Sequence, residues 1–271
     1  MNLELKPRSH HLPGLAAALA LVALPAQAIV GGTPTASFAS VGTGVQVAPD
    51  WVFTVEHAAL GIGATYGNGF GARTVAARYD APGSGTFPAN DFALLRLAPA
   101  ATAAPFLAVN GSPVPDGTFD PLPVTIVSAA NHGPARGSAF TTISEAAVMG
   151  DDNSKPPQLV TVNWLVSWDA VVHVQGGDSG GGLFAGHVGD SSVLLGITSA
   201  LITDEQNNPL GSAFVQPAAY RSWIDSKMAD DLADTQAVLW TTAVPEPATW
   251  ALWAAGLAVL VARGRRPRKE S

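Results

Sequence analysis

The hydrophobic residues in the central part of the chain come in short runs rather than at the spacing of a helix. Between residues 29 and 220, clusters of Gly, Pro, Asn and Asp separate these runs. The runs cover residues 41–47, 51–55, 92–97, 124–128, 159–168 and 193–201. Short apolar runs bounded by turn residues are typical of β-strands. Because roughly 190 residues are more than one small sandwich needs, the pattern predicts an all-β protein with two antiparallel β-barrels.

A loop-rich stretch and a short helix complete this prediction. Residues 99–123 contain several turn-forming Asn, Gly, Asp and Pro residues, so we expect the seam between the two barrels there. After Pro217 the composition becomes helical over residues 218–234. In that segment the larger apolar side chains recur at helix-like spacing, at Trp223, Ile224, Met228 and Leu232.

The first 28 residues have the layout of a secretory signal peptide. Lys6 and Arg8 precede an apolar run over residues 15–24, and Ala26-Gln27-Ala28 follows it. A basic flank, an apolar stretch and a small-residue cleavage site in this order predict export. The alternative is a short buried helix.

The last 27 residues, 245–271, have a second targeting layout. Pro245-Glu246-Pro247 is followed by the uncharged apolar stretch 249–262 and then by five Lys and Arg residues. As a helix, the apolar stretch spans about 21 Å, less than the ~30 Å hydrocarbon core of a bilayer. Basic residues after a membrane helix stay in the cytoplasm, which places the body outside. This tail resembles the PEP-CTERM sorting signal of Gram-negative bacteria, and the resemblance implies recognition and removal by an exosortase. A plain membrane anchor is the alternative, and it puts the body in the same compartment.

The composition narrows the chemistry. The chain has 271 residues and no Cys, so a disulfide framework, thiolate zinc sites, iron–sulfur clusters and a cysteine nucleophile are excluded. We expect no metal and no cofactor. Residues 29–243 hold 18 Asp and Glu against 7 Lys and Arg. An acidic body of this kind argues against nucleic acid as a partner.

One glycine-rich segment is suited to nucleophilic catalysis. Residues 176–182 read Gly-Gly-Asp-Ser-Gly-Gly-Gly and place Ser179 in a turn. Glycines let neighbouring backbone N–H groups converge on one point, which makes a site for an oxyanion. A serine also needs a base and an orienting carboxylate. His57 ends one apolar run and Asp91 begins another. The alternative interpretation of the glycine segment is an ordinary hairpin.

These residues lie in four motifs that resemble the chymotrypsin-like (trypsin-like) serine peptidases, in the order found in that family. The motifs are Ile29-Val30-Gly31-Gly32, the block from Trp51 to Ala58, the block from Asp91 to Leu97, and Gly177-Asp178-Ser179-Gly180-Gly181. The resemblance spans 29–225 and implies two six-stranded β-barrels with a C-terminal helix. It further implies hydrolysis of protein or peptide substrates, with Ser179 as nucleophile, His57 as general base and then acid, and Asp91 as the residue that fixes the imidazole tautomer.

The same resemblance implies further roles and boundaries. The amides of Gly177 and Ser179 would form the oxyanion hole, and the amino group of Ile29 would pair with Asp178 after cleavage behind Ala28. The signal peptidase would then be the activating enzyme. The expected organisation is a signal peptide (1–28), a first barrel (29–115), a second barrel with the closing helix (116–234), a linker (235–244) and the sorting segment (245–271).

The substrate pocket is the part that the sequence defines least. The resemblance assigns His173 to the base of the pocket and Ser199, Ala200 and Leu201 to its wall. The position at the base of the pocket holds no carboxylate that could pair with a buried Arg or Lys of the substrate. Two substrate preferences remain open. Leu201 would narrow the pocket and favour small or medium apolar side chains, whereas His173 would instead receive an acidic side chain.

Three positions depart from the family pattern, and two other functions stay in view. Ala58 stands where animal members commonly have a disulfide cysteine, Gly182 where proline is usual, and Glu56 beside the histidine is unusual. One alternative is a surface or matrix module that has the protease-like fold but no catalytic activity. An esterase would use the same triad on small esters.

Overall fold

The computed structural model describes residues 29–83, 87–114, 122–128, 136–143, 148–151, 159–186, 192–231 and 236–242. The expected signal peptide and the sorting segment therefore lie outside the described residues. In the described part, no helix is both long enough and apolar enough to span a bilayer.

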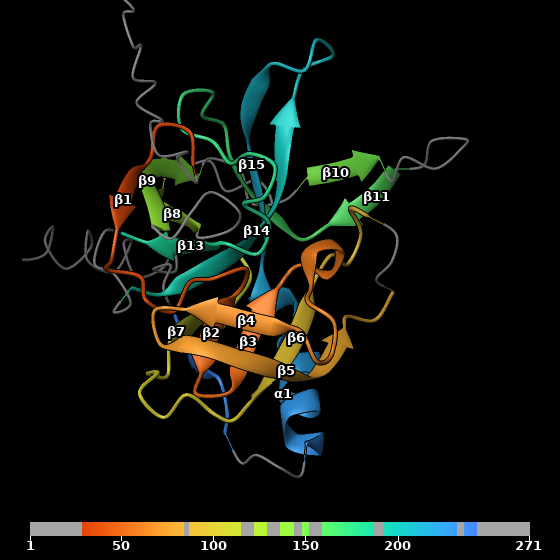
Figure 1. The fold of residues 1–271 in the computed structure, drawn as a ribbon. Helices are drawn as coiled ribbons and strands as arrows, with labels where there is room; N and C mark the ends of the chain where they lie inside the picture. The colour runs from red at the N-terminus through yellow and green to blue at the C-terminus, as the bar shows by residue number, and fades with distance from the viewer. Residues whose placement is uncertain are drawn as a thin grey trace, which may run out of the picture.

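The first half of the chain forms a five-stranded antiparallel sheet that curls on itself (Figure 1). Its spatial order is β2-β3-β6-β5-β4. The strands are β2 (Val45–Ala48), β3 (Trp51–Thr54), β4 (Thr65–Asn68), β5 (Gly71–Asp80) and β6 (Ala93–Ala98). Trp51, Phe53 and Leu94 are buried, as expected for strands with one face on a core.

The second half forms a larger sheet with the path β1-β9-β8-β13-β14-β15-β12. Its strands are β1 (Thr33–Thr35), β8 (Leu122–Ser128), β9 (Arg136–Ile143), β12 (Trp164–Ser167), β13 (Gly182–Ala185), β14 (Leu194–Thr203) and β15 (Pro209–Val215). Two more strands, β10 (Val148–Asp151) and β11 (Leu159–Val162), form a separate antiparallel hairpin. The prediction of a mostly β protein with two curled antiparallel sheets and one short closing helix is confirmed.

The strand count differs from the expected six and six. The described residues place five strands in the first sheet and nine in the second. The difference arises because β7 (Ala108–Asn110), in the expected seam, pairs in parallel with β14 rather than joining the first sheet. A further strand, β16 (Leu239–Thr241), pairs in parallel with β7.

One apolar core is shared by the two sheets. Phe53 and Leu94 of the first sheet belong to the same buried cluster as Phe184 and Ile197 of the second. Burying large side chains across this boundary removes apolar surface of both sheets from contact with water. The shared core therefore sets the position of one sheet against the other.

The C-terminal part folds back onto this core. A 3₁₀ turn, η3 (Pro217–Tyr220), leads into α1 (Arg221–Asp230). Ile224 and Met228, one turn apart, are the buried residues of α1. The helix thus ends before the expected Asp234. Directly after it, the carboxylate of Asp231 forms an ion pair with Arg96 of β6 at 2.7 Å.

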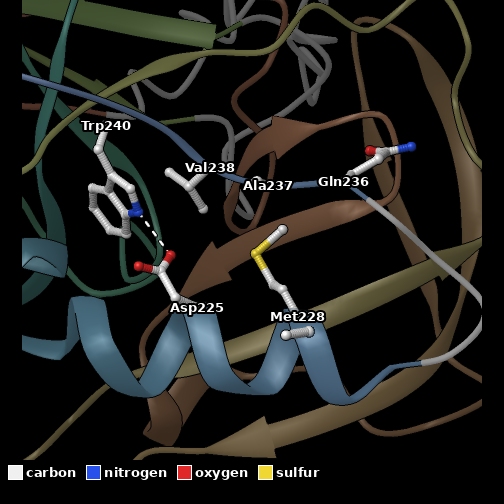
Figure 2. A pocket seen from close by; sticks show the side chains of 7 residues that line it. Asp225, Met228, Gln236, Ala237, Val238 and Trp240 are labelled. Atoms are coloured by element: carbon white, nitrogen blue, oxygen red, sulfur yellow. Dashed lines mark hydrogen bonds between the residues drawn. The ribbon is translucent and has the colours of Figure 1, made fainter.

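The segment 235–244, expected as a linker, includes the docked strand β16. Gly111 donates its amide to the carbonyl of Thr241 at 2.7 Å, and the Trp240 indole donates to Asp225 of α1 at 2.8 Å. A pocket of about 460 Å³ lies between α1 and this segment, and Figure 2 shows side chains that line it. Its lining residues are Asp225, Met228, Ala229, Gln236, Ala237, Val238 and Trp240.

Candidate active site

Three separate turns carry the predicted catalytic side chains. His57 lies in η1 (Glu56–Ala58), a single 3₁₀ turn that follows β3. Asp91 stands two residues before β6, directly after Asn90, whose φ of 51° reverses the chain. Ser179 lies in the glycine-rich turn that precedes β13. The first two come from one sheet and the serine from the other, so the shared core brings the three together.

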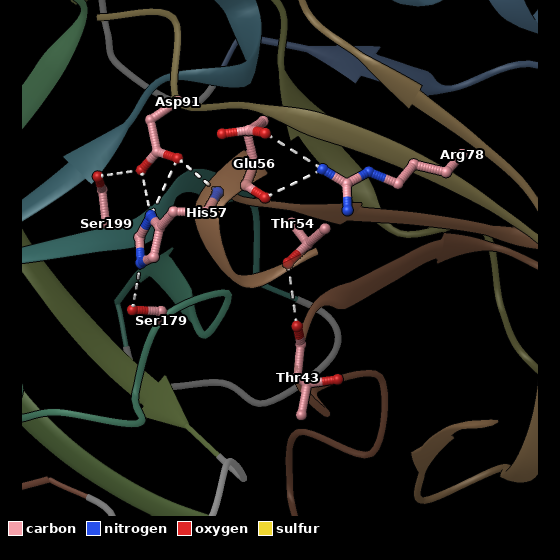
Figure 3. Close-up of polar contacts among 8 residues, drawn as sticks. All are labelled: Thr43, Thr54, Glu56, His57, Arg78, Asp91, Ser179 and Ser199. Carbon is pink, nitrogen blue, oxygen red and sulfur yellow. Dashed lines mark hydrogen bonds and ion pairs between the residues drawn. The ribbon is translucent and has the colours of Figure 1, made fainter. Parts of the chain in front are cut away.

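The three side chains form a continuous chain of hydrogen bonds, drawn in Figure 3. Nε2 of His57 lies 2.9 Å from Oγ of Ser179. On the other side of the ring, Nδ1 lies 3.0 and 2.9 Å from the two oxygens of Asp91. Because an ionised carboxylate only accepts hydrogen bonds, Nδ1 carries the proton and neutral Nε2 is free to accept from the serine hydroxyl.

This environment raises the pKa of His57 above its ordinary value of 6.5. The hydrogen bond that the ring donates to Asp91 is the largest cause, and partial burial of the ring opposes it. The negative charges of Asp91 and Glu56 raise the pKa further. The imidazolium that forms when His57 takes a proton is therefore stabilised at this position.

Asp91 is a buried carboxylate with several donors around it. Its side chain is 1% exposed. The backbone amide of His57 donates to Oδ1 at 3.1 Å, and the hydroxyl of Ser199 donates to Oδ2 at 2.6 Å. Donors of this kind offset the cost of removing a charged group from water.

Ser199, one of the predicted pocket residues, lies beside Asp91, and its hydroxyl donates to Oδ2 of that carboxylate. It stands at a register irregularity of β14, between Thr198 and Ala200. Its role in lining the substrate pocket stays a prediction. The sequence showed Ser199 on this strand but carried no signal for the face it occupies.

The glycine turn around Ser179 is conformationally special at two positions. Gly177 has φ +100° and Gly180 has φ +88°, values that side chains rarely adopt. A Cβ on Gly180 would lie 2.3 Å from the carbonyl oxygen of Thr43, so the turn packs closely against the first sheet. Among the described residues, the amides of Gly177 and Ser179 donate to no acceptor, whereas those of Asp178, Gly180 and Gly181 do.

The start of the described chain packs into the second sheet. The Ile29 side chain is fully buried among Ile126, Leu183 and Phe214. The next residue, Val30, donates its amide to the carbonyl of His173 at 3.1 Å. Asp178 is fully buried too, and its Oδ2 accepts the amide of Gln175 at 2.8 Å. The pairing of the Ile29 amino group with Asp178 stays a prediction.

The remaining predicted pocket residues lie on two segments. His173 is buried, and its Nδ1 donates to the carbonyl of Ala170 at 3.0 Å. On β14, Ala200 is half-buried and pairs with Ala213, while Leu201 is 36% exposed and pairs with Ser212. Whether these residues bind the substrate side chain stays a prediction.

One contact of His57 and one contact of the residues beside it had no signal in the sequence. Phe87 packs edge-on against the imidazole, with ring centroids 5.3 Å apart. Arg78 of β5 donates to backbone carbonyls on either side of His57, at Glu56 and Ala59.

Two family models match the chain. The family model described as Trypsin matches residues 26–224. The chain belongs to the trypsin family. A second model, the PEP-CTERM protein-sorting motif, matches residues 243–269. No curated protein matches the chain.

The protein is thus a trypsin-like serine protease domain joined to a PEP-CTERM export signal. That signal indicates export and sorting to the cell envelope in Gram-negative bacteria. Within the trypsin family the glycine at 182 departs from the usual proline, and Phe184 explains why it is tolerated here. A Cβ on Gly182 would lie 2.5 Å from the Phe184 ring, which occupies that space.

Proposed function

We propose that the protein is an exported serine endopeptidase that cleaves peptide bonds through an acyl-enzyme intermediate. The single observation that carries this proposal is the unbroken line of hydrogen bonds from Ser179 through His57 to Asp91. A serine hydroxyl is a poor nucleophile unless its proton leaves as it attacks. The neutral Nε2 at 2.9 Å is placed to take that proton.

The reaction then has two halves. Oγ of Ser179 attacks the substrate carbonyl carbon while its proton moves to Nε2 of His57. The resulting tetrahedral oxyanion collapses, the C–N bond breaks, and His57 gives the proton to the leaving amine. In the second half, water attacks the ester carbonyl carbon while His57 takes its proton. The tetrahedral intermediate then collapses, the bond to Ser179 breaks, and His57 returns the proton to the serine oxygen as the acid leaves. Asp91 holds Nδ1–H throughout and stabilises the imidazolium without taking the proton itself.

We assign the oxyanion hole to the backbone amides of Gly177 and Ser179. Both amides lack an acceptor among the described residues, so they are available for a developing negative charge. The left-handed φ of Gly177 supports this assignment, because it allows the peptide to turn toward the serine. Donors fixed before the reaction stabilise the oxyanion without reorganisation cost.

The two ends of the chain define the route of export in this proposal. A signal peptidase removes 1–28, and the new amino group of Ile29 pairs with Asp178 to order the oxyanion turn. The full burial of the Ile29 side chain and of Asp178 supports this part. An exosortase recognises the segment 245–271, and the stretch 249–262 holds the protein in the membrane until the tail is removed.

A fluorescent phosphonate that reacts only with activated serines tests the activity directly. The purified protein should be labelled stoichiometrically, and Ser179→Ala should not be labelled. Ser222→Ala, at an exposed serine of α1, serves as a serine control that keeps the nucleophile and the contacts of the triad. A folded parent protein that resists the phosphonate would instead support the inactive surface module.

A further inference from the structure

The turn that carries His57 has few anchors of its own. None of the three residues of η1 is buried, and its first residue lacks a side-chain cap. Its backbone-to-backbone hydrogen bonds are one from Ala58 to Val55 at 3.3 Å and one from Ala59 to Glu56 at 3.1 Å, and the amide of His57 donates to Asp91 at 3.1 Å. The chain also has no cysteine that could tie this turn to a neighbouring strand. The hydrogen bonds of a short 3₁₀ turn have poorer geometry than those of an α-helix, so contacts from other elements help to fix its conformation.

Arg78 supplies such contacts from β5. Its Nη1 donates to the carbonyl of Ala59 at 2.8 Å, and its Nη2 donates to the carbonyl of Glu56 at 3.3 Å. These two carbonyls lie on either side of His57 in the chain. One guanidinium therefore bridges the beginning and the end of the turn.

Two carboxylates hold the guanidinium in place. Glu56 Oε1 lies 3.2 Å from Nη2, and Asp80 Oδ1 accepts from Nε at 2.7 Å. Figure 3 shows Arg78 reaching both the side chain and the backbone oxygen of Glu56. The side chains of Arg78 and Glu56 are each 24% exposed, so water has limited access. The planar fork of arginine satisfies all four acceptors at once, which a lysine cannot do in the same geometry.

We propose that Arg78 is a positioning residue for His57, because its guanidinium clamps the two ends of the turn that carries the ring. This inference rests on the proposed peptidase function. His57 must keep 2.9 Å to both Ser179 and Asp91 for proton transfer. Displacements of about 1 Å at such distances cost on the order of a hundredfold in rate. Isolated ion pairs near a surface contribute little stability, so the clamp on the backbone is the more consequential role.

A charge-conserving substitution separates positioning from electrostatics. The groups facing His57 are Asp91 and Ser179 at its ring nitrogens, Phe87 at its edge, and Glu56 in its own turn, with Arg78 and Asp80 behind Glu56 on β5. Arg78→Lys keeps the net charge of this set. Any change in the His57 pKa then reports a change in the Asp91 hydrogen bond rather than a lost charge.

The control is an arginine on the neighbouring strand. Arg96 of β6 is similarly exposed, at 22%, and makes an equally short ion pair with Asp231, but within the described part of the chain no hydrogen bond or ion pair joins it to η1. Arg78→Lys and Arg96→Lys are compared with the parent for kcat and KM, with enzyme concentrations set by active-site titration. The His57 pKa is measured by NMR in a Ser179→Ala background, where no turnover is needed.

Arg78→Lys should lower kcat about tenfold with KM unchanged, and it should lower the His57 pKa because the Asp91 hydrogen bond loosens. Arg96→Lys should change neither quantity. If Arg78→Lys keeps the parental kcat and His57 pKa and loses only thermal stability, as Arg96→Lys does, the positioning role is wrong. A parent enzyme without any peptidase activity would refute the proposed function instead, and the NMR titration would still decide the clamp.

Discussion

Removing the Ser199 hydroxyl should weaken the fold at the triad. The bond from Ser199 to Asp91 is 2.6 Å long, has an ionised acceptor, and is buried at both ends. Hydrogen bonds to charged groups contribute about 1.5–3 kcal/mol. We therefore expect Ser199→Ala to lower the free energy of unfolding by that amount at neutral pH. For a domain of this size, the loss corresponds to a melting temperature lower by roughly 3–12 °C.

Chemical denaturation followed by tryptophan fluorescence measures this loss. Ser222→Ala, an exposed serine on α1, is the control and should stay within about 0.5 kcal/mol of the parent. Turnover in Ser199→Ala should fall less than tenfold, because both Asp91 oxygens keep their contact with His57. A loss no larger than that of Ser222→Ala would show that the short bond to Asp91 contributes nothing to stability and would refute the reasoning.

Three further predictions concern the pH profile and the two ends of the chain. The base must be neutral to accept the serine proton, and the pKa of His57 is raised, so kcat/KM should fall with decreasing pH through a midpoint above 6.5; a midpoint below 6.5 would contradict the Asp91 contact. Protein that starts at Ile29 should be active, and protein with a few extra residues before Ile29 should lose most of its activity; equal activity, with both N-termini confirmed by sequencing, would exclude the buried-terminus mechanism. In a host with the sorting machinery, mass spectrometry of the extracellular form should show no residues beyond about 247, and a protein that still carries 263–271 would refute processing of the tail.

The three residues of the candidate triad could be picked out from the sequence because each stands at the end of a regular element in a motif of distinctive composition. His57 follows an apolar run, Asp91 precedes one, and Ser179 sits among glycines. Their meeting depends on the packing of two sheets, which no local pattern encodes. The expectation that the three side chains meet came from the family resemblance and not from the hydrophobic periodicity.

The failures of prediction have local physical causes. The run 41–47 is strand only from Val45, because close backbone approaches at Gly42 and Gly44 set the path before it. The run 159–168 divides at Asn163, because its two halves pair with different strands, β10 and β15. Strand β16 is three residues long, and its pairing with β7 joins segments about 130 positions apart.

The side-chain contacts around the triad were the least predictable part. Ser199 donates to Asp91 from a register irregularity of β14, and the sequence does not show where that irregularity falls. Arg78 reaches η1 only because the register of β5 on β6 places Arg78 opposite Leu95. A one-residue slip in that register would turn the arginine to the other face.

The turnover of peptide substrates by the processed protein and by its Ser179→Ala variant tests the central claim most directly. The parent should cleave a mixed peptide pool with internal cuts, and Ser179→Ala should lose on the order of 10⁶-fold in kcat. Both proteins should unfold at the same temperature within a few degrees, because the substitution removes only one half-buried hydroxyl oxygen. Peptide cleavage that persists in folded Ser179→Ala at the parental rate would contradict the assignment of the nucleophile and of the mechanism built on it.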